Sequence, residues 1–199
     1  MPINTKDIKR LKDLTGVGLT DAKNALEQNA GDFDKALQEM RQKGLTKADK
    51  RSAREARQGL VVTYNHDNKI AVVLELNCET DFVARNEIFA NLAKDIAMHI
   101  TASNPEFLDI DKVPPQELQK IKEEFLQKAK ATNKPTEMID TIVKNQVQKY
   151  FSEKCLMDQP FIKDPDMTIR DLIKANIAKL GENIVIRRYY RIALGEIVD

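Results

Sequence analysis

The stretch GLVVTYNHDNKIAVVLEL, residues 59–76, marks a change from helical spacing to strict alternation of apolar and polar residues. The alternation occurs on both sides of the polar interval NHDN at 65–68. Such a pattern indicates two strands that each bury one face, joined by a tight turn rich in Asn and Asp. We therefore predict a β-hairpin. Its apolar face would consist of Leu60, Val62, Tyr64, Ile70, Val72, Leu74 and Leu76.

A third alternating stretch, IVIRRYYRIAL, occupies residues 184–194. We expect it to pair with the hairpin, which gives a three-stranded antiparallel sheet. Its Arg and Tyr side chains can form cross-strand pairs or a surface for stacking RNA bases, and cross-strand pairing is the commoner use. Alternation would place Ile184, Ile186, Tyr190, Ile192 and Leu194 on one face, and Val185, Arg187, Tyr189 and Arg191 on the other.

Residues 1–45 show helical spacing, interrupted by glycine-containing breaks at 15–18 and 29–31. Three short amphipathic helices with small apolar faces can form a compact module, but not a large core. The expected faces are Ile8, Leu11 and Leu14 in the first helix, Leu19, Ala22, Ala25 and Leu26 in the second, and Phe33, Leu37 and Met40 in the third.

The boundaries of these helices follow from residues that favour helix ends. Asn4 or Thr5 can cap the first helix and Asp32 the third, because their side-chain oxygens accept hydrogen bonds from free backbone amides. Gly44 predicts the end of the third helix. Residues 46–58, TKADKRSAREARQ, lack large apolar side chains and predict a basic, solvated helical linker.

Helical spacing returns after the hairpin, so residues 59–199 combine a sheet with covering helices and the fold class is α+β. The expected elements are a helix over 86–103, a helical hairpin over 114–156 divided at Pro135, a loop over 159–166 that contains two prolines, and a helix over 168–180 ended by Gly181.

Composition limits the possible functions. The chain has 32 basic and 31 acidic residues, a balance that argues against a dedicated nucleic-acid binder. Two widely separated cysteines, Cys78 and Cys155, suggest free thiols in a reducing compartment. We expect a cytoplasmic protein, because the amino-terminal residues show no signal-peptide pattern and no long apolar run could cross a membrane.

No arrangement of residues predicts an enzyme or a cofactor site. His66 falls in the hairpin turn and His99 on the charged side of a helix, and neither has neighbours that suggest a triad or a metal site. The seven glycines form no phosphate-binding loop. The sequence therefore favours a protein that acts by binding, without a metal or cofactor of its own.

The segment NCETDFVARN, residues 77–86, joins the hairpin to the next helix. Thr80 and Asp81 are residue types that cap or begin helices. Phe82 has two interpretations: a buried core residue of the next helix, or an aromatic held out at the bend for a partner. Spacing alone supports burial of Phe82 at least as strongly as it supports an exposed role in binding a partner.

Four blocks together resemble the bacterial and organellar translation elongation factor Ts family. They are LKDLTGVGLTDAKNAL at 11–26, NCETDFVARN at 77–86, CLMDQPFIKDP at 155–165 and GENIVIRRYYR at 181–191. The resemblance implies a guanine-nucleotide exchange factor for elongation factor Tu, the GTPase that delivers aminoacyl-tRNA to the ribosome. It also implies a ubiquitin-associated-like module at 1–45 and a core dimerisation domain at 59–199.

The resemblance also implies the site. The family's exchange element matches Thr80, Asp81, Phe82 and Val83, and in the family it enters the nucleotide domain of elongation factor Tu and disturbs magnesium coordination. Phe82 would be the apolar wedge, and Asp81 would rearrange polar contacts.

A second contact surface in the family corresponds here to Lys12, Leu19, Thr20 and Lys23. The family often has methionines where this chain has Leu19 and Thr20, and ordinary packing at a helix start is the alternative role for both. Arg187 and Arg188, by contrast, are expected to be structural or dimer-related.

The chain is similar to short family members that have one core subdomain where longer members have two. Such members are expected to form homodimers, which gives a two-plus-two complex with elongation factor Tu. The alternative is a ribosome- or RNA-associated module that uses the basic residues of 41–57 and the terminal Arg/Tyr strand. Salt dependence separates the two, because RNA binding weakens steeply with salt.

Overall fold

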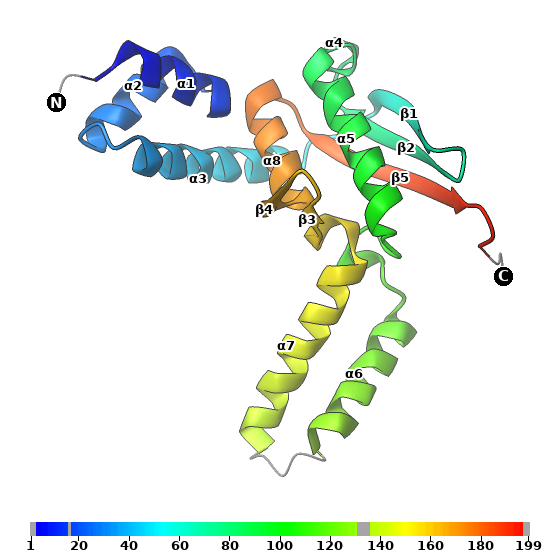
Figure 1. Ribbon diagram of the computed structural model, residues 1–199. Helices are drawn as coiled ribbons and strands as arrows, with labels where there is room; N and C mark the ends of the chain where they lie inside the picture. Colours follow the sequence, from blue (N-terminus) through cyan, green and yellow to red (C-terminus); the bar gives the residue numbers. More distant parts are fainter. Residues whose placement is uncertain (1–2, 16, 131–135, 197–199) are drawn as a thin grey trace. The chain divides into compact units, whose positions relative to one another are not determined.

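The computed structural model describes residues 3–15, 17–130 and 136–196 (Figure 1). The chain forms two compact units, one made of Met1–Met98 with Arg170–Asp199 and the other of His99–Ile169. The observed mixture of helices with a three-stranded antiparallel sheet confirms the predicted α+β class. The domain limits at 45 and 58 stay predictions.

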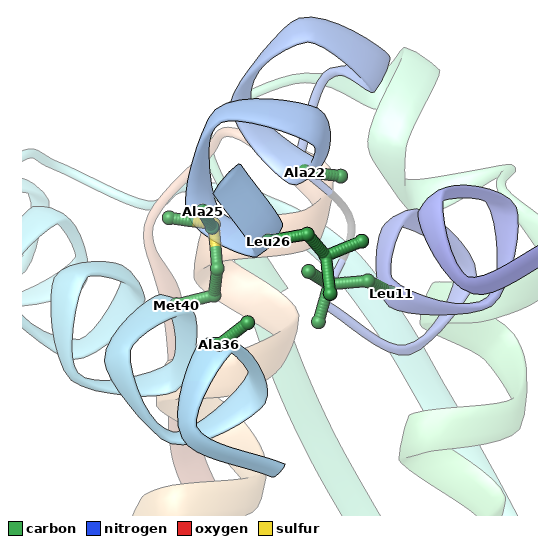
Figure 2. Close-up of a cluster of buried hydrophobic side chains, with 6 residues drawn as sticks. All are labelled: Leu11, Ala22, Ala25, Leu26, Ala36 and Met40. Carbon is green, nitrogen blue, oxygen red and sulfur yellow. The ribbon is translucent and has the colours of Figure 1, made fainter. Parts of the chain in front are cut away.

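The first unit begins with three helices, α1 (Thr5–Thr15), α2 (Leu19–Gln28) and α3 (Phe33–Arg51), as predicted. The side chain of Asn4 accepts a hydrogen bond from the amide of Lys6 at 3.0 Å, and that of Asp32 accepts one from Lys35 at 3.1 Å. Both predicted caps are therefore confirmed. Figure 2 shows the small core that the helices share, which consists of Leu11, Ala22, Ala25, Leu26, Ala36 and Met40.

The predicted end of the third helix at Gly44 is wrong, because α3 continues to Arg51. A glycine inside a helix costs only about 1 kcal/mol relative to alanine, and contacts beyond it offset that cost. The guanidinium of Arg51 donates to the carbonyl of Ile177 at 3.1 Å, and Asp49 forms an ion pair with Lys174 at 2.6 Å. Only the first part of the predicted helical linker is therefore helical.

The sheet contains β1 (Gln58–His66), β2 (Ile70–Cys78) and β5 (Ile184–Ala193), with β2 in the middle and both pairings antiparallel (Figure 1). The hairpin and its pairing with the terminal strand are thus confirmed. Asp67 and Asn68 turn the chain with φ values of 50° and 55°. Two consecutive positive φ values characterise the type I′ turn, and the amide of Lys69 closes this turn by donating to the carbonyl of His66 at 3.0 Å.

The terminal strand contains a bulge that the alternating pattern concealed. Glu75 pairs with Arg188 and Leu76 pairs with Ile186, so Arg187 is an extra residue between them. A bulge of one residue reverses which face the following side chains occupy. Ile184 and Ile186 are buried, whereas Tyr190, Ile192 and Leu194 are exposed. The prediction that these five residues share one face is therefore wrong.

The other helices of the first unit are α4 (Asp81–Ala84), most of α5 (Glu87–Ser103) and nearly all of α8 (Ile169–Leu180). The helix predicted over 86–103 is confirmed as α5, and its apolar residues Phe89, Leu92 and Ile96 are at most 4% exposed. The buried residues of these helices and of the inner sheet face include Phe89, Leu92, Ile96, Ile173, Ile177, Val72, Leu74 and Leu76.

The second unit contains the predicted helical hairpin, formed by α6 (Pro115–Lys130) and α7 (Thr136–Lys154). Pro135, which was predicted to divide it, lies outside the described residues. Short 3-10 helices, Ile110–Lys112 and Leu156–Asp158, flank the hairpin.

The segment predicted as a loop at 159–166 instead contains most of a small antiparallel sheet, β3 (Pro160–Phe161) with β4 (Asp164–Thr168). Two-stranded sheets tolerate proline because each strand has one unpaired edge. Phe161 of β3 is only 4% exposed, so its burial holds the β3–β4 sheet against the rest of the second unit.

His99 is also placed differently from the prediction. It is 1% exposed, and its Nε2 lies 3.0 Å from Oε1 of Gln159, rather than on a charged helix face. The helix itself was predicted correctly. Its buried face, opposite the charged residues, is wide enough to include His99.

Candidate functional site

The segment predicted to act on a partner forms α4, a helix of four residues directly after β2. Ala84 is buried and Val83 half-buried, so these side chains hold α4 against the protein. Phe82, by contrast, is 83% exposed. The interpretation of Phe82 as a core residue is therefore wrong, and the aromatic ring is free to contact another molecule.

Thr80 caps this helix. Its Oγ1 accepts a hydrogen bond from the amide of Val83 at 3.4 Å, and its carbonyl accepts one from the amide of Ala84 at 3.2 Å. Asp81 lies in the first turn, where a negative charge favours the helix. The carboxylate of Asp81 is 3.1 Å from the guanidinium of Arg85. The two polar residues before Phe82 thus have separate local roles.

Glu182, which sequence reasoning did not single out, accepts two hydrogen bonds from this segment. Its carboxylate accepts hydrogen bonds from the amide of Thr80 at 3.0 Å and from the hydroxyl of Thr80 at 2.6 Å. A charged acceptor makes both bonds stronger than their neutral equivalents. No local pattern could reveal this pair, because the two residues are 102 positions apart.

The neighbouring residues form a matching connection. The amide of Asn183 donates to the carboxylate of Glu79 at 2.7 Å, and the Asn183 side chain donates to the carbonyl of Arg54 at 2.6 Å. Arg54 in turn lies 3.6 Å from the Glu79 carboxylate. We call Arg54, Glu79, Thr80, Glu182 and Asn183 the polar junction. It connects the chain after α3, the start of α4 and the start of β5.

Cys78 lies beneath this junction and is fully buried. Its Sγ donates to the carbonyl of Thr80 at 3.1 Å. Burial raises the pKa of the Cys78 thiol to about 11, and the carboxylate of Glu182 acts in the same direction. A protonated, buried thiol is a poor nucleophile and metal ligand. Cys78 and Cys155 are both free, as predicted.

The second predicted surface is exposed. Lys12, Leu19, Thr20 and Lys23 all lie on the outside of the three-helix module. Leu19 is 57% exposed, so its expected place in the apolar face of α2 is wrong. Lys23 forms an ion pair with Glu27 at 3.6 Å. Gly16 of the intervening loop lies outside the described residues.

The outward face of the sheet carries exposed apolar side chains from all three strands. We call Val61, Val73, Val185, Tyr190 and Ile192 the open sheet face, and each is between 40% and 72% exposed. Val73 pairs with Tyr190 in the register, so these side chains adjoin across strands.

Two of the three arginines of β5 have acidic partners. The Arg188 guanidinium lies 2.8 Å from the carboxylate of Glu75 on the neighbouring strand, and Arg191 pairs with Glu196. The contact between Arg188 and Glu75 is a cross-strand pair, as the sequence favoured over RNA stacking, whereas the contact between Arg191 and Glu196 is local.

Over residues 3–15, 17–130 and 136–196, no group of three or more His, Cys, Asp or Glu side chains could hold a metal ion. Within the same ranges, no helix is long and apolar enough to cross a membrane.

A family model described as Elongation factor TS matches residues 19–196 of the chain. The Elongation factor Ts of Thermodesulfovibrio yellowstonii is 49% identical over 199 residues, which is 100% of both chains. The Elongation factor Ts of Syntrophus aciditrophicus is 46% identical over 197 residues, 98% of each chain. That of Fervidobacterium nodosum is 43% identical over 197 residues, 98% of this chain and 100% of the relative. The matched residues thus extend over both units.

Proposed function

This chain belongs to the elongation factor Ts family, and we propose that it releases GDP from elongation factor Tu by means of the segment Thr80–Val83. GTPases hold GDP partly through a magnesium ion that contacts the phosphates and the protein. In the proposed mechanism the segment enters beside that ion and disturbs its coordination. GDP then loses part of its binding energy and dissociates faster.

The exposure of Phe82 is the observation that carries this proposal. A side chain that is 83% exposed contributes little to folding, but it can be buried by a partner. Full burial of a Phe side chain is worth about 2 kcal/mol, which corresponds to about a thirtyfold change in an equilibrium constant. A pocket that accepts Phe82 only after the magnesium site is disturbed would favour that state by such a factor.

The mechanism needs differential binding and no covalent step. A ligand shifts a conformational equilibrium only by its difference in affinity for the two states. Asp81, beside Phe82 and 52% exposed at its side chain, would compete for polar contacts near the ion. Because coupling is reciprocal, bound GDP with magnesium should weaken the binding of this protein to the same extent.

The direct test measures release of a fluorescent GDP analogue from purified elongation factor Tu. The native protein should accelerate release, and Phe82→Ala should lose most of the acceleration while its thermal unfolding stays unchanged. Met138→Ala, which removes an apolar side chain that is 54% exposed on α7, serves as the matched control. If the native protein gives no acceleration at equimolar amounts, exchange activity is excluded. If Phe82→Ala is fully active, the wedge mechanism is wrong.

The exposed residues Lys12, Leu19, Thr20 and Lys23 support a second contact with elongation factor Tu. A contact made equally before and after magnesium displacement contributes affinity without changing the maximal rate. Leu19→Ala should therefore raise the concentration needed for half-maximal exchange and leave the maximal rate intact. A lower maximal rate at unchanged half-saturation would contradict this assignment.

The open sheet face supports the proposed homodimer. Exposed apolar side chains that share one face of a sheet favour association with another molecule. A second copy of the chain presents the same surface, so a two-fold arrangement could bury both faces together. Light scattering should give twice the mass of the chain at micromolar concentration, and a monomer would exclude the two-plus-two complex.

The RNA-associated alternative has less support. It would use the basic side chains of β5, but two of its three arginines, Arg188 and Arg191, are already paired with Glu75 and Glu196. Binding to RNA should weaken steeply as salt rises, whereas the proposed complex should change little. The role of the family in translation also supports the expected cytoplasmic location.

A further inference from the structure

We propose that Glu182 is a positioning residue for nucleotide exchange, which fixes Thr80 and thereby the direction in which Phe82 projects. This inference rests on the proposed function of Thr80–Val83. Glu182 itself is not placed in contact with elongation factor Tu. Its effect passes through the two hydrogen bonds that its carboxylate accepts from Thr80.

The exchange segment needs an external support because α4 has only four residues. Helices of this length are unstable alone, since forming the first turn costs more than one hydrogen bond returns. Phe82 cannot stabilise the helix by packing, because it is 83% exposed. The conformation of α4 therefore depends on its two ends. Ala84, which is 6% exposed, holds the far end, and Thr80 holds the near end.

Every polar group of Thr80 is engaged in holding the segment. Its amide and hydroxyl donate to Glu182, and its carbonyl accepts from Ala84 and from the thiol of Cys78. The hydroxyl oxygen also accepts from Val83 at 3.4 Å. Glu182 supplies the only charged partner in this set among the contacts of the described residues, and charge-assisted bonds have the stronger directional preference.

Glu182 is itself held on both sides. It follows Gly181, whose φ of 84° ends α8 and turns the chain toward β5. It precedes Asn183, which is 2% exposed and bonded to Glu79 and to the carbonyl of Arg54. Glu79 thus binds Asn183, and the adjacent Thr80 binds the adjacent Glu182. Paired connections of this kind restrict rotation more than a single bond can.

The consequence for exchange is geometric. A wedge has to meet its pocket in one orientation, and a displacement of about 1 Å at a reacting centre can cost about a hundredfold in rate. Without Glu182, α4 would sample several orientations while the three-helix module still binds. Glu182→Ala should therefore lower the maximal rate of catalysed GDP release about tenfold or more and change half-saturation much less.

The experiment compares five variants in the GDP-release assay, with circular dichroism and thermal unfolding to establish folding. Glu182→Ala and Thr80→Val should both lower the maximal rate, and the double variant should lose less than the product of the two single effects. Thr80→Ser, which keeps the hydroxyl, should lose less than Thr80→Val. Glu55→Ala is the control, because Glu55 is exposed and its carboxylate forms an ion pair with exposed Arg57, so the rate of this variant should equal that of the native protein.

Phe82→Ala, measured beside these variants, separates failure of this inference from failure of the proposed function. If Phe82→Ala is slow but folded Glu182→Ala is as fast as the native protein, Glu182 has no positioning role and the wedge mechanism stands. If Phe82→Ala is fast, the wedge mechanism and this inference both fall. Fully multiplicative effects in the double variant would also overturn the inference. If Glu182→Ala does not fold, Thr80→Val becomes the test of the positioning role. A native rate of GDP release in folded Thr80→Val would overturn the inference.

Discussion

His99 should make the second unit sensitive to acid, and its surroundings determine how strongly. Its Nε2 lies 3.0 Å from Oε1 of Gln159. Gln159 is fixed in that orientation because its own Nε2 donates to the carbonyl of Glu153 at 2.7 Å. Oε1 can only accept, so Nε2 of His99 carries the proton. Nδ1 then remains unprotonated and buried, without a hydrogen-bond partner among the described residues.

Burial lowers the pKa of His99 below its ordinary value of 6.5, and the hydrogen bond with Gln159 opposes this with a smaller effect. Below that ordinary value the unfolded chain binds a proton that the folded protein does not, so stability rises with pH. The contribution of neutral, buried His99 to stability is fully present above pH 6.5 and is lost as the pH falls below that value. The loss at about pH 5.5 has an upper limit of about 1.4 kcal/mol, which is reached if His99 stays neutral in the folded state.

Thermal unfolding measures this effect at about pH 7.5 and about pH 5.5. A loss of this size lowers Tm by about 3–6 °C in a chain of this length. His99→Gln removes the titrating group, and His66→Gln is the matched control because His66 is exposed. The native protein and His66→Gln should lose more stability on acidification than His99→Gln does. An identical loss in all three proteins would refute the reasoning.

Three further predictions concern the sheet and the helical module. Gly59→Ala should destabilise the protein by more than about 1 kcal/mol in urea unfolding, because φ is 153° and a Cβ would lie 2.1 Å from the carbonyl oxygen of Leu76. Leu26→Ala should cost about 3 kcal/mol and should accelerate amide exchange in α1–α3. Equal acceleration in β2 would contradict a separate small core. Ile192→Glu should reduce the proposed dimer to a monomer in light scattering, whereas Met138→Glu should leave the mass unchanged.

The sequence predicts the hairpin and most helices because side-chain periodicity reflects burial directly. Strict alternation over 59–76 has one good solution, since a shift of one residue would expose the whole apolar face. The type of each long element follows in the same way, and so do the caps at Asn4 and Asp32. These features depend on residues within a few positions of one another.

The errors occur where distant contacts decide the outcome. The bulge at Arg187 adds one residue to β5, and the local alternation continues on both sides of it. The helix α3 passes through Gly44 because Asp49 and Arg51 contact α8. Neither contact leaves a signal near the glycine. A tertiary interaction of moderate strength is enough to override a local preference of about 1 kcal/mol.

The candidate site likewise contains one residue that the sequence identified and one that it did not. The family resemblance identified Phe82, although periodicity within a four-residue helix could not show which way its ring points. Glu182 was missed because its partner Thr80 lies in a different part of the sequence. A glutamate placed between a helix-ending glycine and a strand is a common surface residue. Only the three-dimensional structure distinguishes it from one that holds a distant loop.

Phe82 and the polar junction have opposite relations to stability. Phe82 is so exposed that its removal should leave the free energy of unfolding unchanged, and only an interaction with a partner gives the side chain an energetic effect. Asn183 is buried and its side chain donates two hydrogen bonds, so its removal should lower stability. Glu182 lies between these cases, since it is half-buried and binds the segment that carries Phe82. If rigidity of α4 matters for exchange, the loss of rate among the variants should follow their effect on Thr80, not their effect on unfolding. A correlation of rate with global stability alone would instead mean that the junction only keeps the protein folded.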